Sequence, residues 1–369
     1  MKGTNDKMKE LNFVNKLVSH NYRQWIEDFA KGNECYPQII ELDPTSKCMY
    51  LCECCINSNI INKTEPMKQD ELIKFIDEFC EFGGKGIIFI GGGEPLMYPN
   101  IGDVFEYVYQ KGIKIGITTN GLLIDKYINE ISKYAQWTRV SVDAATEEMY
   151  QKVRPCKYRD AYKRVLENCK KLVPLKRGTL GFSFLIVENE HYCNVGEIFS
   201  AALLAKQIGF DYFEIKPMVD ENHFLYEYTT DTLKKTFEQL GEALCLNDDR
   251  FEIIYPESLK QYKEDSLLQN KSYSTCPVMN LRCVVTNHGI YPCPYKRGYQ
   301  KFNMGSISDG YKKFVHSEKY KTALSELNPE RDCHFFCIRN DINNILDMMK
   351  NGQVDYRKLD YTENSDVFV

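Results

Sequence analysis

The stretch "QIIELDPTSKCMYLCECC", residues 38–55, starts as a short β-rich segment and ends in a loop that holds four cysteines. Three of them, Cys48, Cys52 and Cys55, follow the spacing C-x3-C-x2-C. Three thiolates leave one iron of a four-iron cluster without a protein ligand, and that open iron can bind a small molecule directly. A structural zinc site would need a fourth ligand, and only Cys54 lies nearby. The loop therefore favours an open [4Fe-4S] cluster over a zinc knuckle or mere cysteine richness.

The composition of the whole chain limits the class of protein to which this loop belongs. The 369 residues include 15 cysteines and carry a formal net charge of -5, which argues against a general nucleic-acid binder. No apolar run is long enough to span a membrane, and the first residues carry no secretory signal. We therefore expect a cytoplasmic protein with reduced thiols, where clustered cysteines indicate metal or redox chemistry more than disulfides.

Strand-like and helix-like segments alternate from about residue 36. Six strands are expected within 38–43, 86–90, 113–119, 138–144, 179–188 and 211–217, with five helices between them. This alternation predicts a parallel sheet with right-handed crossovers. The pattern breaks after Lys216, so we expect an α/β fold: a partial (β/α)6 TIM-like barrel with a small C-terminal extension of a β-hairpin plus helix.

The same pattern divides the chain into five parts. We expect an N-terminal helical extension at 1–35, the partial barrel at 36–220, a helical connector at 221–274, a cysteine-rich domain at 275–345 and a C-terminal tail at 346–369.

The predicted strands end in short polar motifs. Gly92, Gly93 and Glu94 follow the second strand, "TNG" (119–121) follows the third, and "SVDA" (141–144) ends the fourth. In parallel α/β folds these loops carry the chemistry. Together with the C-x3-C-x2-C loop after the first strand, these three motifs in this order resemble the radical S-adenosylmethionine (radical SAM) superfamily over about residues 36–220. The resemblance implies that a reduced cluster cleaves SAM, and that the resulting 5'-deoxyadenosyl radical abstracts a hydrogen atom from the substrate.

The resemblance also implies roles for residues around SAM. Gly92 and Gly93 would let the backbone approach the methionine part closely, and Glu94 would orient its ammonium group. Arg154 is a candidate partner for the SAM carboxylate, unless it is a surface arginine. The residue before the last cluster cysteine is usually aromatic in the superfamily and packs near the adenine; here it is Cys54.

Two further pairs complete the predicted SAM site. Ser141 and Asp143 have period-two spacing, so both face one side of their strand and could bind the ribose hydroxyls. The alternative is that one of them caps the next helix. Thr119 and Asn120 would either polarise the site or shape the turn.

A second cysteine set begins with "CPVMNLRCVVTNHGIYPC", residues 276–293, which has the pattern of a hairpin. With "CHFFC" at 333–337 it resembles the SPASM and Twitch extensions of radical SAM enzymes, which bind auxiliary [4Fe-4S] clusters. The resemblance implies one such cluster with the ligands Cys276, Cys293, Cys333 and Cys337. Cys283 is the substitute ligand, and a zinc ribbon is the alternative site.

The substrate is the least defined part. We expect a small hydroxylated or sugar-like metabolite, which would undergo dehydrogenation, dehydration or epimerisation in specialised metabolite biosynthesis. The alternative is a ribosomal peptide, although only about 35 residues precede the first strand, too few for a winged-helix domain that binds leader peptides. A non-catalytic iron-sulfur electron carrier or sensor is a third reading. The resemblance implies an electron donor such as flavodoxin or ferredoxin.

Several residues near the strand ends are candidates for contact with the substrate. Those with polar or charged groups are Glu188, Glu214, Lys216 and His223, at or just past the fifth and sixth strands. Epimerisation needs a hydrogen donor on the opposite face of the substrate, for which the spare thiols are Cys54, Cys156 and Cys193.

Overall fold

The computed structural model describes residues 13–220, 222–263, 269, 271–333 and 335–369. Its strands form one sheet in the order β7-β6-β5-β4-β3-β2-β1-β8-β9. All neighbours pair in parallel except β8 and β9. The bounds are β1 Ile39–Asp43, β2 Gly86–Phe89, β3 Lys114–Thr119, β4 Ala135–Ser141, β5 Thr179–Leu185, β6 Tyr212–Lys216, β7 Glu252–Ile254, β8 Arg282–Thr286 and β9 Gly289–Tyr291. The sheet is open at β7 and β9, so the partial α/β barrel predicted from the sequence is confirmed.

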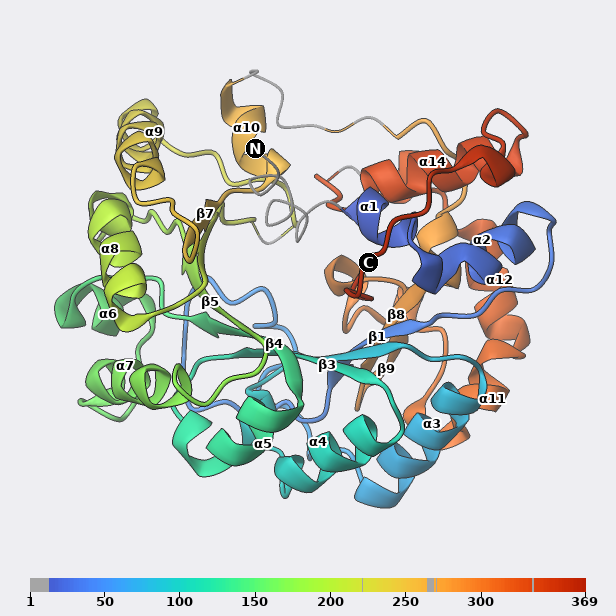
Figure 1. The fold of residues 1–369 in the computed structure, drawn as a ribbon, viewed down its shortest axis with the longest axis horizontal. Helices are drawn as coiled ribbons and strands as arrows, with labels where there is room; N and C mark the ends of the chain where they lie inside the picture. Colours follow the sequence, from blue (N-terminus) through green and yellow to red (C-terminus); the bar gives the residue numbers. More distant parts are fainter. Residues whose placement is uncertain (1–12, 221, 264–268, 270, 334) are drawn as a thin grey trace.

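The helices that connect these strands lie along the outside of the curved sheet (Figure 1). They are α3 Gln69–Glu81, α4 Ile101–Gln110, α5 Ile128–Tyr134, α6 Glu147–Val153, α7 Ala161–Leu172 and α8 Ile198–Ile208. In α3 the buried side chains Leu72, Phe75, Ile76 and Phe79 form the stripe expected from their spacing. The helix ends at Glu81, and Gly83 shortly after it has a φ of +81°, which suits glycine.

The remaining helices belong to the two ends of the chain and to the segment after β6. α9 Thr230–Leu244 packs against α8, and α11 Tyr311–Val315 packs against α3. α14 Asn340–Lys350 contacts both α1 Phe13–Leu17 and α2 Arg23–Ala30. The other α-helices of the described residues are α10 Glu257–Lys260, α12 Glu318–Glu326 and α13 Pro329–Asp332. Among the described residues, no helix is both long and apolar enough to cross a membrane.

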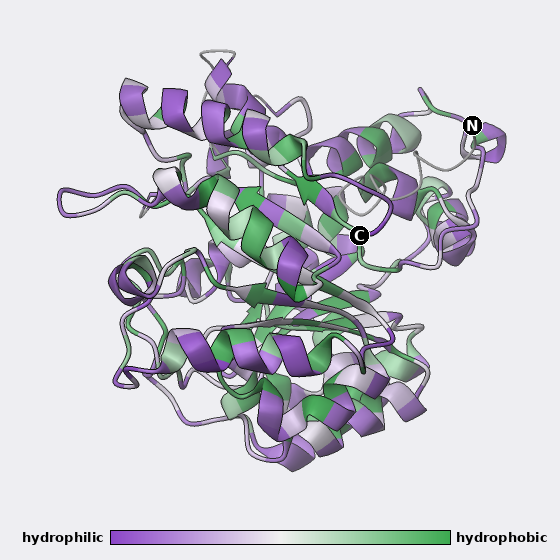
Figure 2. Ribbon diagram, turned by 60° about the vertical axis from the view of Figure 1, so that its left-hand side comes forward, coloured by the Kyte–Doolittle hydropathy of each residue, from purple (hydrophilic) through white to green (hydrophobic). Residues whose placement is uncertain are grey.

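The two faces of the sheet pack against different apolar clusters. Ile40, Leu42 and Phe89 join the apolar core between strands and outer helices, and the hydrophobic colouring of Figure 2 follows the strands and the inner faces of the helices. On the concave face Trp137 meets Phe368, with ring centroids 5.4 Å apart. Residues 367–369 are buried there with other apolar side chains. The apolar part of the concave face is thus filled by the chain itself.

The C-terminal hairpin does not stand apart from the barrel. β8 pairs in parallel with β1, and Glu41 is opposite Val284 in the register. This pairing extends the main sheet beyond β1 with a strand from far along the sequence. The cysteine-rich segment therefore lies next to the loop that carries Cys48, Cys52 and Cys55.

Candidate active site

The loop after β1 brings the three predicted cluster cysteines together. Cys48, Cys52 and Cys55 are free, half-buried thiols, and the charges of Cys48 and Cys55 both interact with Cys52. Burial raises the pKa of Cys48 to about 12, so this thiol is protonated at neutral pH and must release its proton when it binds metal. No three metal-binding side chains among the described residues converge on a single ion. A four-iron cluster takes one thiolate per iron, so these three cysteines would hold three of its four irons.

The glycine run after β2 is docked directly on the cysteine loop. The Glu94 N–H donates to the Lys47 carbonyl at 2.8 Å. A Cβ atom at Gly93 would lie 2.4 Å from the same carbonyl oxygen, so only glycine fits. The glycines were expected to make room for SAM; in the structure they also make room for the backbone just before Cys48.

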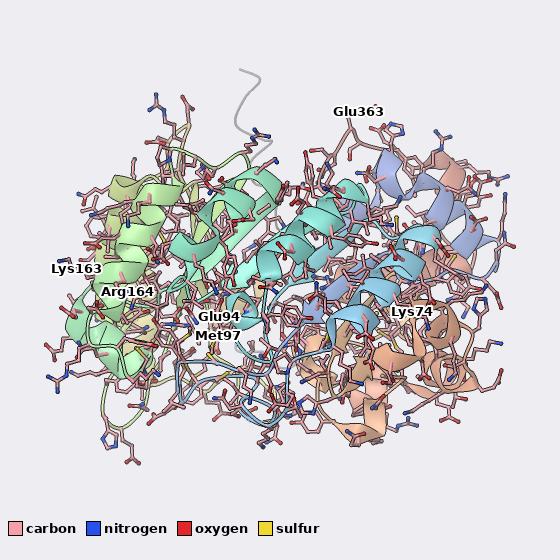
Figure 3. All side chains as sticks on the ribbon, turned by 90° about the horizontal axis from the view of Figure 1, so that it is seen from below. Lys74, Glu94, Met97, Lys163, Arg164 and Glu363 are labelled. Atoms are coloured by element: carbon pink, nitrogen blue, oxygen red, sulfur yellow. The ribbon has the colours of Figure 1, made fainter. Side chains whose placement is uncertain are left out.

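Glu94 is the centre of a buried hydrogen-bond group (labelled in Figure 3). Its carboxylate accepts bonds from Thr119 Oγ1 at 2.6 Å, from the Asn120 N–H at 2.8 Å and from the Leu96 N–H at 3.2 Å. Burial raises the pKa of Glu94, and these donors oppose that rise. A carboxylate offers about four acceptor positions, so one remains for a further donor.

Thr119 and Asn120 also shape the turn after β3. The Gly121 N–H donates to Thr119 Oγ1 at 3.0 Å, and the Leu122 N–H donates to Asn120 Oδ1 at 3.0 Å. The Thr119 hydroxyl therefore both shapes the turn and holds Glu94, whereas Asn120 shapes the turn with its side chain and holds Glu94 with its backbone N–H.

Asp143 and Arg154 form an ion pair beside the cysteine loop. Asp143 follows β4 with a φ of +62°. Its carboxylate accepts from Arg154 Nη1 at 2.5 Å and from the Leu185 N–H at 2.8 Å. The Arg154 guanidinium lies 5.3 Å from the Tyr50 ring centroid. Burial disfavours its charge, but Cys52 and Asp143 outweigh burial and keep the pKa of Arg154 well above its usual value. Arg154 is thus not a surface arginine.

The three spare thiols have different surroundings. Cys54 lies near Asp143, Cys52 and Arg154, and burial raises its pKa to about 12. Cys156 forms a backbone bridge with Tyr50. Cys193 Sγ is 3.6 Å from Thr232 Oγ1 in α9. Cys54 lies among the residues around the predicted SAM site, and Cys156 borders that site through Tyr50.

Three of the predicted substrate residues have different surroundings. Glu188 binds the start of a helix, whereas Glu214 and Lys216 belong to a buried charged group. Glu188 accepts from the Thr229 N–H at 3.0 Å and from Thr232 Oγ1 at 2.5 Å, which caps the start of α9. Glu214 is buried and lies 2.9 Å from Arg139 Nη1 and 3.6 Å from Lys216 Nζ. One carboxylate thus serves two cations on the concave face. Burial lowers the pKa of Lys216, and Arg139 lowers it further.

The four predicted auxiliary cysteines also come together. Burial raises the pKa of Cys276 well above its usual value, and the charges of Cys337, Cys293 and Cys333 raise it further. The Lys271 ammonium group lies near Cys337 and Cys333 and supplies positive charge beside them. His223, after β6, has its ring centroid 5.5 Å from that of Tyr295 and 6.4 Å from that of Phe335, close in sequence to Cys293 and Cys333. The loop after β6 therefore packs against aromatic residues that are close in sequence to the auxiliary cysteines.

Cys283 lies apart from this group. Its side chain is buried in the core, and its charge acts on Tyr311 and Tyr320. Within the described residues, its own electrostatic partners are Arg282 and Glu41. We expect Cys283→Ala to cost about 1 kcal/mol of unfolding free energy through a small cavity and to leave the iron content unchanged. Iron and sulfide assays after anaerobic reconstitution check this, with Cys293→Ala as the matched variant that loses iron. A loss of iron in Cys283→Ala would make it a ligand.

Sequence reasoning missed Arg139, Asn57 and Arg297. Arg297 pairs with Asp43 at the end of β1, and its guanidinium also reaches Asn57 in the cysteine loop. Motif spacing gives no sign of these contacts. The one sign of them is that Glu41 and Asp43 are charged residues in the apolar strand β1, where both are buried. Buried charges need partners of opposite charge or hydrogen-bond donors.

Comparison with known proteins decides the family of the central part. Residues 42–193 match the model of the Radical SAM superfamily. These residues form a radical SAM domain. The radical SAM domain runs from the end of β1 to the loop after β5 and contains Cys48, Cys52, Cys55, Glu94, Asp143 and Arg154. The auxiliary cysteines lie outside the match.

Curated relatives match parts of the chain. The AdoMet-dependent heme synthase of Methanosarcina barkeri is 29% identical over 176 residues, 47% of this chain and 48% of that protein. A probable GTP 3',8-cyclase of Methanocaldococcus jannaschii is 26% identical over 232 residues, 59% of this chain and 76% of that protein. The first three relatives are matched over only 26%, 48% and 58% of their own lengths.

Solved structures share the fold over most of the chain. Streptococcus suis SuiB bound to the precursor peptide SuiA has a TM-score of 0.63 at 15% identity, with 94% of this chain and 79% of that chain covered. Native anSMEcpe with bound AdoMet has a TM-score of 0.59 at 15% identity, with 86% and 97% covered. At these identities the likeness concerns the fold alone.

Proposed function

We propose that this protein is a radical SAM enzyme that acts on a small hydroxylated or sugar-like metabolite. The observation that carries the proposal is the meeting of three cysteines, Glu94 and the Asp143–Arg154 pair at the carboxyl ends of β1 to β4. A [4Fe-4S] cluster on Cys48, Cys52 and Cys55 would leave one iron open for SAM. When bound, the cluster and SAM supply a 5'-deoxyadenosyl radical that abstracts a hydrogen atom.

The chain's own residues would then hold SAM in place. Glu94 has one acceptor position left after its three hydrogen bonds, which suits the SAM ammonium. Arg154 is buried next to Cys52 and would bind the carboxylate. Ser141 and Asp143 would bind the ribose, since each Asp143 oxygen can accept a second bond beyond Arg154 and Leu185.

Charged groups on the concave face favour a polar substrate. Arg139 and Lys216 both pair with Glu214, and the further carboxylates that act on them, Glu41 and Asp143, are already paired with other arginines. Such a group suits hydroxyl or acidic oxygens of a small metabolite. An auxiliary [4Fe-4S] cluster on Cys276, Cys293, Cys333 and Cys337 would lie beyond the loop after β6 and could take an electron from the substrate, which fits dehydrogenation. Dehydration and epimerisation remain open, with Cys54 as the candidate hydrogen donor.

The proposal is tested by fractionating the source cell extract and measuring 5'-deoxyadenosine with an electron donor such as flavodoxin. We expect a small-molecule fraction, not a peptide fraction, to stimulate its formation. A product two mass units lighter, without solvent deuterium, supports oxidation, and deuterium uptake from deuterium oxide supports epimerisation. If only a peptide stimulates the reaction, the substrate is a peptide and the metabolite proposal fails.

A further inference from the structure

Arg297 joins the two cysteine sites. It lies on the same turn as the predicted auxiliary ligand Cys293, because the Lys296 N–H donates to the Cys293 carbonyl at 3.1 Å and the Arg297 N–H to the Pro294 carbonyl at 3.3 Å. Its side chain is only 3% exposed and reaches Asp43 at the end of β1 and Asn57 in the cysteine loop. A residue from the C-terminal segment is therefore buried against the radical SAM domain.

The Arg297 guanidinium donates hydrogen bonds there through Nη1 and Nη2, and its Nε forms an ion pair with Asp43 without a hydrogen bond. Nε lies 2.9 Å from Asp43 Oδ2, and Nη2 lies 3.3 Å from Glu41 Oε2. Nη1 donates to Asn57 Oδ1 at 2.9 Å and to the Gly91 carbonyl at 3.3 Å. The Asn57 amide also donates to the Gly91 carbonyl. The first peptide of the glycine run is thus fixed by one donor from the cysteine loop and one from the C-terminal turn.

The glycine run depends on such outside contacts. Residues 91–93 have no side chains of their own, and at Gly92 an added Cβ would meet Ile60 and Asp43. Asn57 lies two residues after Cys55, so the contacts that hold Gly91 also connect it to the cysteine loop. The planar guanidinium can bind several acceptors in fixed directions at once, which an ammonium group cannot do.

We propose that Arg297 is a positioning residue for SAM: it holds the glycine run against the cysteine loop, although it lies outside the radical SAM domain. The inference rests on the proposed function, because it assumes that SAM binds beside Gly92 and Glu94. It adds a residue of the C-terminal segment to the structural support of the SAM site.

Arg297→Lys tests the proposal. Lysine can keep one ion pair with Asp43 or Glu41, but its single nitrogen cannot also reach Asn57 and Gly91. We expect SAM to bind about 10- to 100-fold more weakly, the usual loss when a residue that supports a metal site is replaced. The iron content and the electron paramagnetic resonance signal of the reduced protein at saturating SAM should stay those of the wild type. The measurement is equilibrium binding of SAM to anaerobically reconstituted protein.

Arg282→Lys is the matched control. Arg282 is equally buried and pairs with the same Glu41, but its other contact is the Val369 carbonyl and not the glycine run. Its SAM dissociation constant should stay within about twofold of the wild type. Asn57→Ala decides the question if Arg297→Lys does not fold, and it should weaken SAM binding about tenfold.

The outcomes separate the two proposals. SAM binding by Arg297→Lys as tight as that by Arg282→Lys, or by Asn57→Ala as tight as wild type, overturns the role of Arg297. Equal weakening by Arg297→Lys and Arg282→Lys also overturns it, because the effect would then be general to the buried charges. If the wild-type protein with its iron in place does not bind SAM at all, the proposed function itself fails.

Discussion

Replacing Cys48, Cys52 and Cys55 together by alanine is expected to abolish reductive cleavage of SAM. The three thiols are the predicted ligands of the open cluster. Arg154 beside them has no acceptor atom for iron, and the Glu94 carboxylate is already held by hydrogen bonds from Thr119, Asn120 and Leu96. The wild-type protein, reconstituted anaerobically and given a strong reductant, should form 5'-deoxyadenosine slowly even without substrate. The variant should form none, which liquid chromatography of the products measures directly.

The same variant should lose about half of its iron. Two four-iron clusters give about eight irons per chain, of which about four should remain at the auxiliary cysteines. Cys80→Ala is the matched control, since Cys80 is a half-buried thiol in α3 that donates only to the Lys111 carbonyl. It should keep all of its iron and its SAM cleavage. Persistent 5'-deoxyadenosine formation in the triple variant would refute the assignment of the three ligands.

The second large effect is expected from the auxiliary cysteines. Replacing Cys333 and Cys337 by alanine removes two of four thiols that lie close enough to interact electrostatically. We expect the iron content to fall from about eight to about four per chain. At saturating SAM and with a strong reductant, SAM cleavage should persist, but formation of an oxidised product should stop because the electron has no acceptor.

Metal analysis distinguishes this outcome from the alternatives. Stoichiometric zinc in the wild-type protein, with iron only at the level of one cluster, would identify the site as a zinc ribbon. An unchanged iron content in the double variant would show that the four cysteines hold no cluster. If the double variant forms product at the wild-type rate, the auxiliary cysteines have only a structural role.

The contrast between Glu94 and Glu188 shows how far motif reasoning reaches. Glu94 belongs to a motif in which the glycines, the carboxylate and the strand end are adjacent in sequence. It accepts hydrogen bonds from Thr119 and Asn120 at the next strand end, and its role toward SAM stays a prediction. Glu188 was chosen only for its place after a strand. Its carboxylate instead caps α9, a helix that begins about 40 residues later, and no local pattern announces that contact.

The sequence by itself determined the strand and helix alternation, the cysteine loop and the polar strand ends, because these depend on local periodicity and on short spacings. Only the tertiary structure decided that β8 pairs with β1 and that residues 367–369 fill the concave face. It also decided that Arg297 reaches Asp43 and Gly91. The physical reason is that buried charges must find partners and parallel strands must find neighbours wherever the chain offers them, at separations of hundreds of residues that local patterns do not encode.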